Sequence, residues 1–384
     1  MSAPPEIAWS EGGVARVARW RSERGAPPPA RVVVADDRLS ADEAYGLAGQ
    51  GIGLLWRGDY QNARQLLTAL ASRFDRHARR THRASSPGAS MADRFHRMRQ
   101  ARSQRARTLG MLLVPVDGDY RVPLARAPRI DEACSEAWGP ADGIVSVTSL
   151  REVLGLIGAH EWRRTGVEVP ALGARIHPHY GVFAPVRGEY VDLVAGARLP
   201  AALATHDIAF DIGTGTGVLA AVLARRGVGR VIATERSPRA IACARDNLSR
   251  LRLDDRVEVV DADLFPPGRA ALVVCNPPWV PARPATPLEA GVYDEGSAML
   301  KGFLHGLAGA LVPGGEGWLV LSDLAERLEL RARDEWLAWA ATAGLVVAGR
   351  EDARPRHPKA SDPDDPLHAA RAAEVTSLWR LVAA

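Results

Sequence analysis

Asn276-Pro277-Pro278-Trp279 directly follows the apolar run 272–275, which has the character of a buried strand. The two prolines restrict the backbone dihedral angles, so the Asn276 side chain and a nearby carbonyl are held in fixed directions. Two acceptors in that arrangement can hold both hydrogens of an NH2 group, and Trp279 can stack on the planar group that carries it. The motif therefore predicts chemistry at an NH2 nitrogen that depends on positioning and electrostatic alignment, without an obligatory general base.

A glycine-rich loop lies between a predicted strand, 208–212, and a predicted helix that begins at Val218. Its glycines allow a tight turn and a close approach of the backbone to a ligand. The spacing is G-x-G-x-G, whereas dinucleotide-binding loops have G-x-G-x-x-G, so the loop alone does not identify its ligand. The residues predicted to bind a cofactor here are Asp211, Gly213, Thr214, Gly215 and Gly217.

Acidic residues follow the next two predicted strands. Glu235 ends the strand 231–235, about twenty residues after the loop, where a carboxylate can accept both ribose hydroxyl hydrogens. Asp263 follows the strand 257–260 and can accept the amino group of an adenine, while Leu264 or Phe265 packs on the ring. Because ligands of such sheets bind at the carboxyl ends of the strands, these residues together predict an adenosine-containing cofactor.

Strands and helices alternate from about residue 207 onward, which is typical of a parallel sheet with helical crossovers. Further strands are predicted at 272–275, 318–322, 345–348 and 375–382. The last two flank a polar loop around 354–358 and predict an antiparallel hairpin. The predicted fold class is therefore α/β, a Rossmann-like seven-stranded sheet at 169–384 that resembles the methyltransferase variant of this fold, preceded by an α+β accessory domain at 1–168.

Residues 172–384 resemble the class I S-adenosylmethionine-dependent methyltransferases with an Asn-Pro-Pro-aromatic signature. They most resemble the HemK-type group, or "methyltransferase small" group, which methylates a glutamine side-chain amide of release factors. The matching positions are 211–217, Glu235, Asp263, 276–279 and the turn 313–315. The resemblance implies S-adenosylmethionine as cofactor, with Asn276 touching cofactor and substrate, and Asn276, Pro277, Pro278 and Trp279 as the catalytic residues.

The segment 177–190 also resembles the part of those enzymes that lies over the cofactor and the substrate entrance. It adds Tyr180, Phe183 and Arg187 as candidate substrate-binding residues, and Tyr293 joins them from the region after the catalytic motif. His177, His179, Glu289 and Asp294 are weaker candidates for the same pocket.

Two features depart from the HemK pattern. Trp279 stands where those enzymes usually have tyrosine, and the first 170 residues exceed their small helical domain. Because that domain selects the substrate, the resemblance predicts the chemistry and leaves the target open. In this half we expect a strand at 32–35, helices at 40–51, after Asp59 and at 149–166, and strands at 111–116 and 120–124.

The target alternatives are a nucleobase amine of RNA or DNA, a protein glutamine, or a small metabolite. An arginine-rich stretch, 94–107, is compatible with phosphate binding. However, the net charge is only +4, and just Lys301 and Lys359 among the 49 basic residues are lysines, a bias that a GC-rich genome also produces. Solvated helix faces commonly carry such runs.

Composition and residue spacing argue against several other classes of protein and site. The three cysteines form no Cys-x-x-Cys pair, and no His-Glu-x-x-His spacing indicates a metal site. No signal-peptide pattern and no apolar run of about 18 residues is visible, so the prediction is a cytoplasmic protein without a membrane partner. A nicotinamide-dependent oxidoreductase and a catalytically silent RNA-binding protein remain as readings from other classes.

Overall fold

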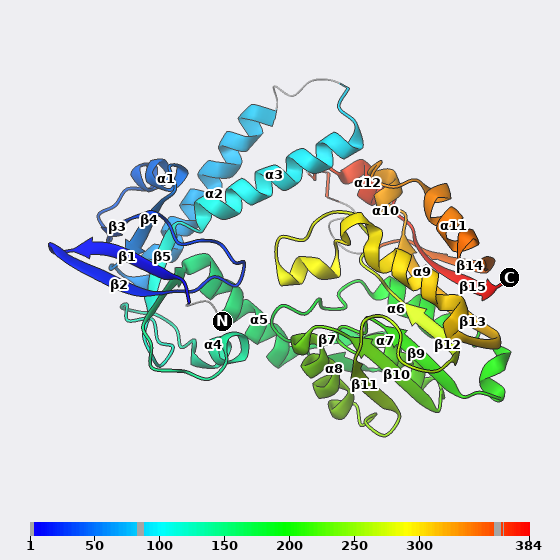
Figure 1. Ribbon diagram of the computed structural model, residues 1–384. Helices are drawn as coiled ribbons and strands as arrows, with labels where there is room; N and C mark the ends of the chain where they lie inside the picture. Colours follow the sequence, from blue (N-terminus) through cyan, green and yellow to red (C-terminus); the bar gives the residue numbers. More distant parts are fainter. Residues whose placement is uncertain (1–3, 83–87, 357–361, 364) are drawn as a thin grey trace. The chain divides into compact units, whose positions relative to one another are not determined.

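A computed structural model describes residues 4–82, 88–356, 362–363 and 365–384 (Figure 1). The chain forms two compact units. Unit 1 comprises residues 1–89 and 96–161, and unit 2 comprises residues 90–95 and 162–384. The short segment Ser90–Phe95, at the start of a long helix, thus belongs with the C-terminal unit.

Unit 2 is built on a seven-stranded sheet in the order β11-β10-β9-β12-β13-β15-β14. The strands β11, β10, β9, β12 and β13 are parallel, and β15 pairs antiparallel with both β13 and β14. The Rossmann-like fold and the antiparallel closing hairpin are confirmed, while residues 357 and 358 of the predicted polar loop lie outside the described residues. The strands are β9 (Ile208–Ile212), β10 (Arg230–Glu235), β11 (Val257–Asp261), β12 (Ala270–Cys275), β13 (Leu311–Ser322), β14 (Leu345–Ala353) and β15 (Thr376–Ala383).

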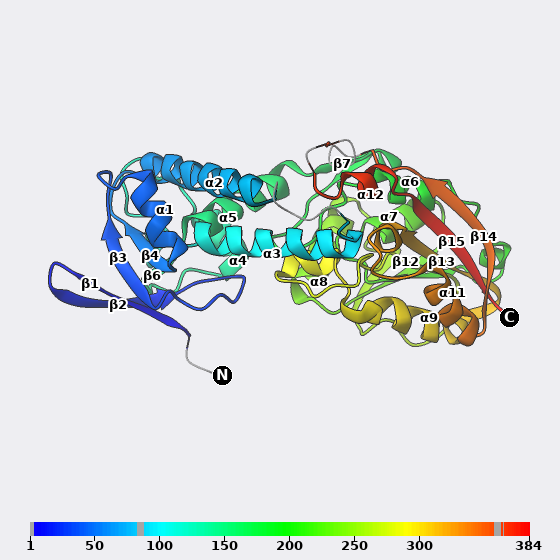
Figure 2. The ribbon, with the colours of Figure 1, turned by 90° about the horizontal axis from the view of Figure 1, so that it is seen from above.

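Helices cover both faces of this sheet because its central strands are apolar on both sides. In Figure 2, α6 (Gly188–Gly196) and α7 (Val218–Arg225) lie on one side of the strands, and α9 (Ala298–Ala310) and α11 (Arg333–Thr342) on the other. All residues of β12 are buried, as is every residue of α7 except its last. The other strands and α-helices of unit 2 are β7 (Val167–Val169), β8 (Ala174–Ile176), α8 (Pro238–Arg250), α10 (Leu324–Arg327) and α12 (His368–Ala372).

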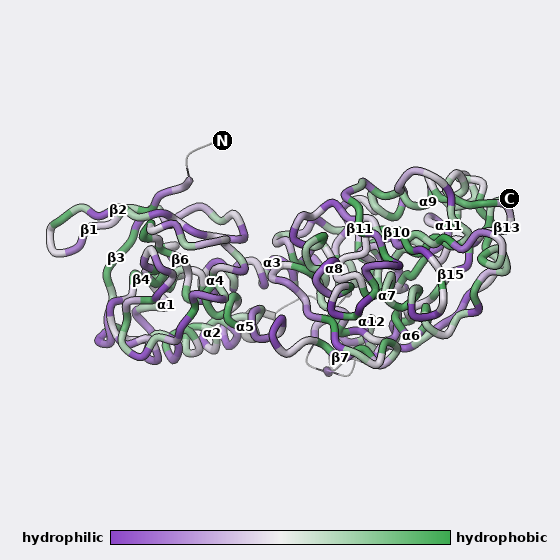
Figure 3. Tube along the Cα trace, turned by 90° about the horizontal axis from the view of Figure 1, so that it is seen from below, coloured by the Kyte–Doolittle hydropathy of each residue, from purple (hydrophilic) through white to green (hydrophobic). Residues whose placement is uncertain are grey.

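Unit 1 contains a six-stranded sheet in the order β1-β2-β6-β5-β4-β3. Its strands β3, β4 and β5 are parallel, and β5 pairs antiparallel with β6. Figure 3 shows hydrophobic segments, in green, running through both units. The elements are β1 (Glu6–Glu11), β2 (Val14–Trp20), β3 (Arg31–Ala35), α1 (Ala41–Gly49), β4 (Ile52–Trp56), α2 (Tyr60–His82), α3 (Met91–Leu109), β5 (Leu112–Val116), α4 (Asp131–Trp138), β6 (Ser146–Ser149) and α5 (Leu150–Thr165).

Most expected elements of unit 1 are present, and the serine half of each predicted capping box is formed at the starts of α1 and α5. The Ser40 hydroxyl accepts the Glu43 N–H at 3.3 Å, and the Ser149 hydroxyl accepts the Glu152 N–H at 3.1 Å. The predicted strand at 120–124 is wrong. Tyr120 has a φ of 59°, and the Asp117 carboxylate accepts the Arg121 N–H at 2.7 Å, so a tight turn replaces extended pairing.

Candidate active site

The parallel strands of unit 2 end at one edge of the sheet, and the glycine loop leaves that edge after β9. Gly213, Gly215 and Gly217 all have positive φ, at 70°, 56° and 82°, which favours glycine over any other residue. A Cβ on Gly213 would lie 2.5 Å from the Met299 Cε, whereas a Cβ on Gly215 would meet no atom within 4 Å. The loop therefore packs closely against the start of α9 at Gly213 and leaves open space at Gly215.

Asp211 braces the loop from beneath. Its side chain is buried, and one carboxylate oxygen accepts the Thr214 hydroxyl hydrogen at 2.6 Å and the Ala220 N–H at 3.0 Å. Burial raises the pKa of Asp211 to about 6, against the lowering effect of these two hydrogen bonds. Asp211 thus connects the strand, the loop and the first turn of α7.

A second brace, which the sequence did not reveal, comes from Asn247 in α8. Its side-chain N–H groups donate to the Thr216 carbonyl at 3.1 Å and the His177 carbonyl at 3.3 Å, and its oxygen accepts the His177 N–H at 2.7 Å. Asn247 is 1% exposed, so these bonds form without competition from solvent. They fix the glycine loop to the segment that follows β8.

Glu235 lies at the end of β10, next to the glycine loop. One carboxylate oxygen accepts the Gly215 N–H at 3.2 Å, and the other accepts the N–H groups of Arg236 and Ser237 at 2.8 and 3.0 Å. These bonds hold the carboxylate next to Gly215, where a Cβ would meet no atom within 4 Å. A ribose diol placed there would find an oriented acceptor.

Asp263 and Leu264 follow β11 at the same edge. Asp263 is largely exposed and pairs with Arg236 at 3.2 Å. Leu264 has a φ of 66°, its carbonyl accepts the Thr234 hydroxyl hydrogen at 2.6 Å, and its side chain packs against Gly302 of α9. Phe265, the alternative ring-packing residue, stacks instead on Phe303 with centroids 5.9 Å apart.

The Asn-Pro-Pro-Trp segment leaves β12, the strand beside β9. The Asn276 Oδ1 accepts the Trp279 indole N–H at 2.9 Å, and the Arg187 guanidinium carbon lies 4.7 Å from the centroid of the Trp279 ring. Pro277 is buried, while Asn276 and Pro278 are half-buried. One face of Trp279 is therefore covered by a cation, and its polar edge is bonded to Asn276.

The other predicted substrate-binding residues, Tyr180, Phe183 and Tyr293, each contact a different neighbour. The Arg239 guanidinium lies 5.5 Å from the Tyr180 ring centroid, and Phe183 packs against Gly291. Tyr293 contacts Phe95 edge to face, with ring centroids 6.2 Å apart. Phe95 is 2% exposed, and no sequence pattern indicated that the start of the arginine-rich helix α3 packs beside the loop after the catalytic motif.

The weaker candidates have structural partners. The His177 Nδ1 lies 2.7 Å from the Arg163 carbonyl, and the His179 Nε2 lies 3.1 Å from the Asp246 carboxylate. Asp294 accepts the N–H groups of Met299 and Leu300 at 3.0 and 3.2 Å, and therefore caps the start of α9. Glu289 accepts the Ala285 N–H at 2.8 Å.

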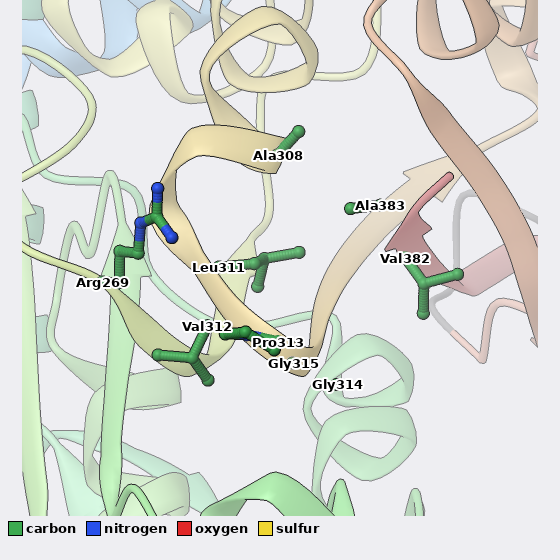
Figure 4. Close-up of a pocket in the computed structure, with 9 residues that line it drawn as sticks. All are labelled: Arg269, Ala308, Leu311, Val312, Pro313, Gly314, Gly315, Val382 and Ala383. Atoms are coloured by element: carbon green, nitrogen blue, oxygen red, sulfur yellow. The ribbon is translucent and has the colours of Figure 1, made fainter.

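Figure 4 shows a cavity of about 290 Å³ elsewhere in unit 2. It is lined by residues at the starts of β12 and β13 and at the end of β15, including Arg269, Leu311 and Val382. This is the amino edge of the parallel strands, opposite to Asp211 and Asn276. The cavity is therefore separate from the candidate active site.

Two features are absent from the described residues. No group of three or more His, Cys, Asp or Glu side chains in these ranges could hold a metal ion. Within the same ranges, no helix has both the length and the apolar character that crossing a bilayer requires.

Comparison with known proteins places this geometry in context. Residues 174–329 match the family model described as "Methyltransferase small domain". The ribosomal protein L11 methyltransferase of Pelotomaculum thermopropionicum is 33% identical over 141 residues, which cover 36% of this chain and 44% of that protein. The release factor glutamine methyltransferase of Moorella thermoacetica is 36% identical over 119 residues, covering 27% of this chain and 42% of that protein.

The tRNA1(Val) (adenine(37)-N6)-methyltransferase of Bacteroides thetaiotaomicron is 30% identical over 154 residues, which cover 38% of this chain and 64% of that protein. The chain thus spans less than half the length of the first two relatives. A solved geranyl diphosphate methyltransferase in complex with SAM aligns with a TM-score of 0.39 and 14% identity, over 57% of this chain and 97% of that chain. The sequence matches confirm the resemblance to HemK-type class I methyltransferases, the methyltransferase identity of the domain and S-adenosylmethionine as its cofactor.

Proposed function

We propose that this methyltransferase domain transfers the methyl group of S-adenosylmethionine to an NH2 nitrogen on a planar group. One observation carries the proposal: the glycine loop, Glu235 and Asn276 leave three neighbouring strands, β9, β10 and β12, at the same edge of the sheet. A cofactor held by the first two elements would lie beside the third.

The described residues fit the cofactor. The open space at Gly215, beside the oriented Glu235 carboxylate, would accommodate a ribose, and Asp263 is exposed for an adenine amino group. Asp211, Gly213, Thr214 and Gly217 would maintain the loop around it. When bound, S-adenosylmethionine supplies an electrophilic methyl group on a sulfonium.

Asn276 then carries the chemical part of the proposal. Its Oδ1 has two acceptor positions, of which the Trp279 indole N–H uses one. The second would accept an N–H of the substrate amine, and the backbone around Pro277 and Pro278 would hold that acceptor in direction. The nitrogen lone pair is thereby aligned for an in-line displacement without a general base.

The site supports the type of reaction and leaves three classes of substrate open. The relatives are named for a release factor glutamine, ribosomal protein L11 and a tRNA adenine. A nucleobase amine, a protein glutamine and a small metabolite therefore all remain compatible with the site, with Tyr180, Phe183, Arg187 and Tyr293 as the proposed substrate-side residues. The cytoplasm remains the predicted location.

The decisive experiment uses S-adenosylmethionine labelled in its methyl group, purified protein and a cell extract, followed by nuclease or protease digestion. Macromolecular label that is released by ribonuclease or deoxyribonuclease identifies a nucleic-acid substrate. Label that resists nucleases and is released by protease identifies a protein, in which methylated glutamine is sought by mass spectrometry. Tight binding of NAD without binding of S-adenosylmethionine would instead favour an oxidoreductase.

A further inference from the structure

Arg187 lies over the ring of Trp279 and pairs with two buried carboxylates, Glu189 and Glu374, and the function proposed above does not use these carboxylates. The guanidinium of Arg187 pairs with Glu189 at 2.7 Å and with Glu374 at 3.0 Å. The exposed fractions of these side chains are 14%, 2% and 0% respectively. Glu374 also accepts the hydroxyl hydrogen of Ser322, which ends β13.

Stability alone does not account for such a group. Burying ions is costly, and well-packed apolar residues of similar volume commonly serve a fold equally well. Here one cation faces two carboxylates, and among the described residues neither the Arg187 Nη2 nor the Glu374 Oε2 has a hydrogen-bond partner. These buried, partly unpaired charges lower the stability of the folded state, so a role in the adjacent site is a better explanation for them than stability.

The adjacent contact is the one between Arg187 and Trp279. The planar guanidinium lies over one ring face, where the ring's negative electrostatic potential attracts it. That face is therefore closed to a substrate. The polar edge of the same ring donates its N–H to the Asn276 Oδ1 at 2.9 Å.

This hydrogen bond determines the orientation of the Asn276 amide. An indole nitrogen only donates, so the atom facing it must be the amide oxygen and not the NH2 group. If the amide turned over, it would present donors to the substrate amine and would repel it. A tyrosine ring at this position has no indole N–H and could not hold the Asn276 oxygen in this way.

We infer that Arg187, Glu189 and Glu374 form a positioning assembly that holds Trp279 so that its indole N–H keeps the Asn276 oxygen directed toward the substrate. The assembly connects the start of α6, the end of β13 and the residue two before β15 to the loop after β12. Its catalytic meaning rests on the proposed function, whereas its geometry does not.

Trp279→Phe tests the inference because it keeps an aromatic ring for stacking and removes the indole N–H together with the five-membered ring. If Trp279 acts by stacking, this variant transfers labelled methyl to the extract at nearly the wild-type rate. Our inference predicts that the rate of methyl transfer falls at least tenfold when the extract fraction that accepts the label is saturating. The dissociation constant of S-adenosylmethionine should stay within twofold of the wild-type value. A wild-type rate in Trp279→Phe overturns the inference.

Indole N–H resonances of the ¹⁵N-labelled full chain provide a readout that needs no substrate. The chain has ten tryptophans, and loss of one signal in Trp279→Phe assigns the resonance. Glu374→Gln and Arg187→Lys should each shift the Trp279 resonance and lower the transfer rate. Arg187→Lys keeps the positive charge and removes the planar guanidinium. It therefore tests the same assembly if Glu374→Gln does not fold.

Glu316→Gln is the matched control. Glu316 similarly accepts a tryptophan N–H, from Trp318 at 3.0 Å, and pairs with Arg380 at 2.6 Å, but it lies outside the proposed site. It should shift the Trp318 resonance and leave that of Trp279 and the transfer rate unchanged. If the Trp279 resonance does not move in Glu374→Gln and Arg187→Lys, the inference is overturned. If the resonance moves but the wild-type protein transfers no methyl group, the assembly is supported and the proposed function is refuted.

Discussion

The Asp211 carboxylate accepts the Thr214 hydroxyl hydrogen at 2.6 Å in a site where Asp211 is only 1% exposed. This contact links the last residues of β9 to the loop that is proposed to hold the cofactor. It places an ionisable group where water cannot stabilise its charge. The consequence is a pH dependence of folding stability that can be measured.

Asp211→Asn should reveal this dependence. The pKa of Asp211 rises from 3.8 to about 6 on folding, chiefly through burial, so the folded state holds its proton over a range where the unfolded state has lost it. The contribution of Asp211 to the free energy of unfolding therefore falls as pH rises from about 4 to about 6 and is level above that. The full change is on the order of 3 kcal/mol for a shift of this size.

Chemical denaturation at pH 4, 5, 6 and 7 measures the effect. The stability of wild type relative to Asp211→Asn should decline across that range. Asp254→Asn, at an exposed carboxylate, should show no comparable trend. A constant difference between wild type and Asp211→Asn would show that burial does not penalise this carboxylate.

Gly213→Ala should mainly lower stability, whereas Gly215→Ala should mainly weaken cofactor binding. Both positions have positive φ, which costs an alanine about 1–2 kcal/mol, but only at Gly213 does the new Cβ meet Met299, at 2.5 Å. Gly213→Ala should therefore lower the free energy of unfolding further, by roughly 1 kcal/mol or more. Gly215→Ala, which enters the open space, should mainly weaken S-adenosylmethionine binding, measured by calorimetry.

A double-mutant cycle with Met299→Ala isolates the contact. The loss caused by Gly213→Ala should shrink in the Met299→Ala background, whereas the loss caused by Gly215→Ala should not. Equal losses for Gly213→Ala in both backgrounds would mean that the contact with Met299 does not limit this position.

Asn247→Ala should weaken both the fold and the cofactor site. The variant leaves the Thr216 and His177 carbonyls and the His177 N–H without their present partner, at a cost of about 2–4 kcal/mol in unfolding free energy. Because Thr216 belongs to the glycine loop, the affinity for S-adenosylmethionine should fall as well. Thermal unfolding and calorimetry measure the two effects separately.

Asn62→Ala in unit 1 is a suitable control. It removes a hydrogen bond to Asp37 of 3.0 Å and lies outside the catalytic unit, so the cofactor affinity should stay unchanged. Full cofactor affinity in Asn247→Ala would show that the loop keeps its conformation without this brace.

Phe95→Ala should destabilise unit 2 although Phe95 lies in an arginine-rich helix. The side chain is 2% exposed and contacts Tyr293 edge to face, so its truncation should cost about 3–5 kcal/mol. Arg94→Ala, at the exposed neighbouring position, should change the unfolding free energy by less than about 0.5 kcal/mol. Denaturant unfolding compares them, and similar values for both variants would refute the packing role.

Local sequence patterns determined much of unit 2. The alternation of strands and helices follows from apolar runs and capping residues that act over a few positions, and the structure contains the expected strands. Two of them are much longer than predicted, since β13 begins at Leu311 and β14 continues to Ala353. The positive φ values at Gly213, Gly215 and Gly217 also follow locally, because only glycine adopts them without strain. The glycine loop and the Asn-Pro-Pro-Trp motif are continuous in the sequence, and Glu235 and Asp263 follow predicted strands, so all of them could be recognised without the tertiary structure.

Patterns were less informative where a short apolar run could belong to several structures. The strand β4, Ile52–Trp56, went unpredicted because five buried residues show no periodicity. Tyr120 was assigned to a strand because its neighbours alternate in polarity, whereas side-chain acceptors of Asp117 hold a turn there. Neighbouring contacts, rather than intrinsic preference, decided both segments.

Only the tertiary structure brought Arg187, Glu374 and Trp279 together. Glu374 stands 187 positions after Arg187, and no local pattern distinguishes it from other surface-type acids. It is buried because β15 inserts between β13 and β14, with Ser322 opposite Thr376, so that the residue two before β15 lies at the catalytic edge. Sequence by itself determines which residues can form strands and bind a cofactor, while strand order, a consequence of long-range packing, decides which distant charges surround them.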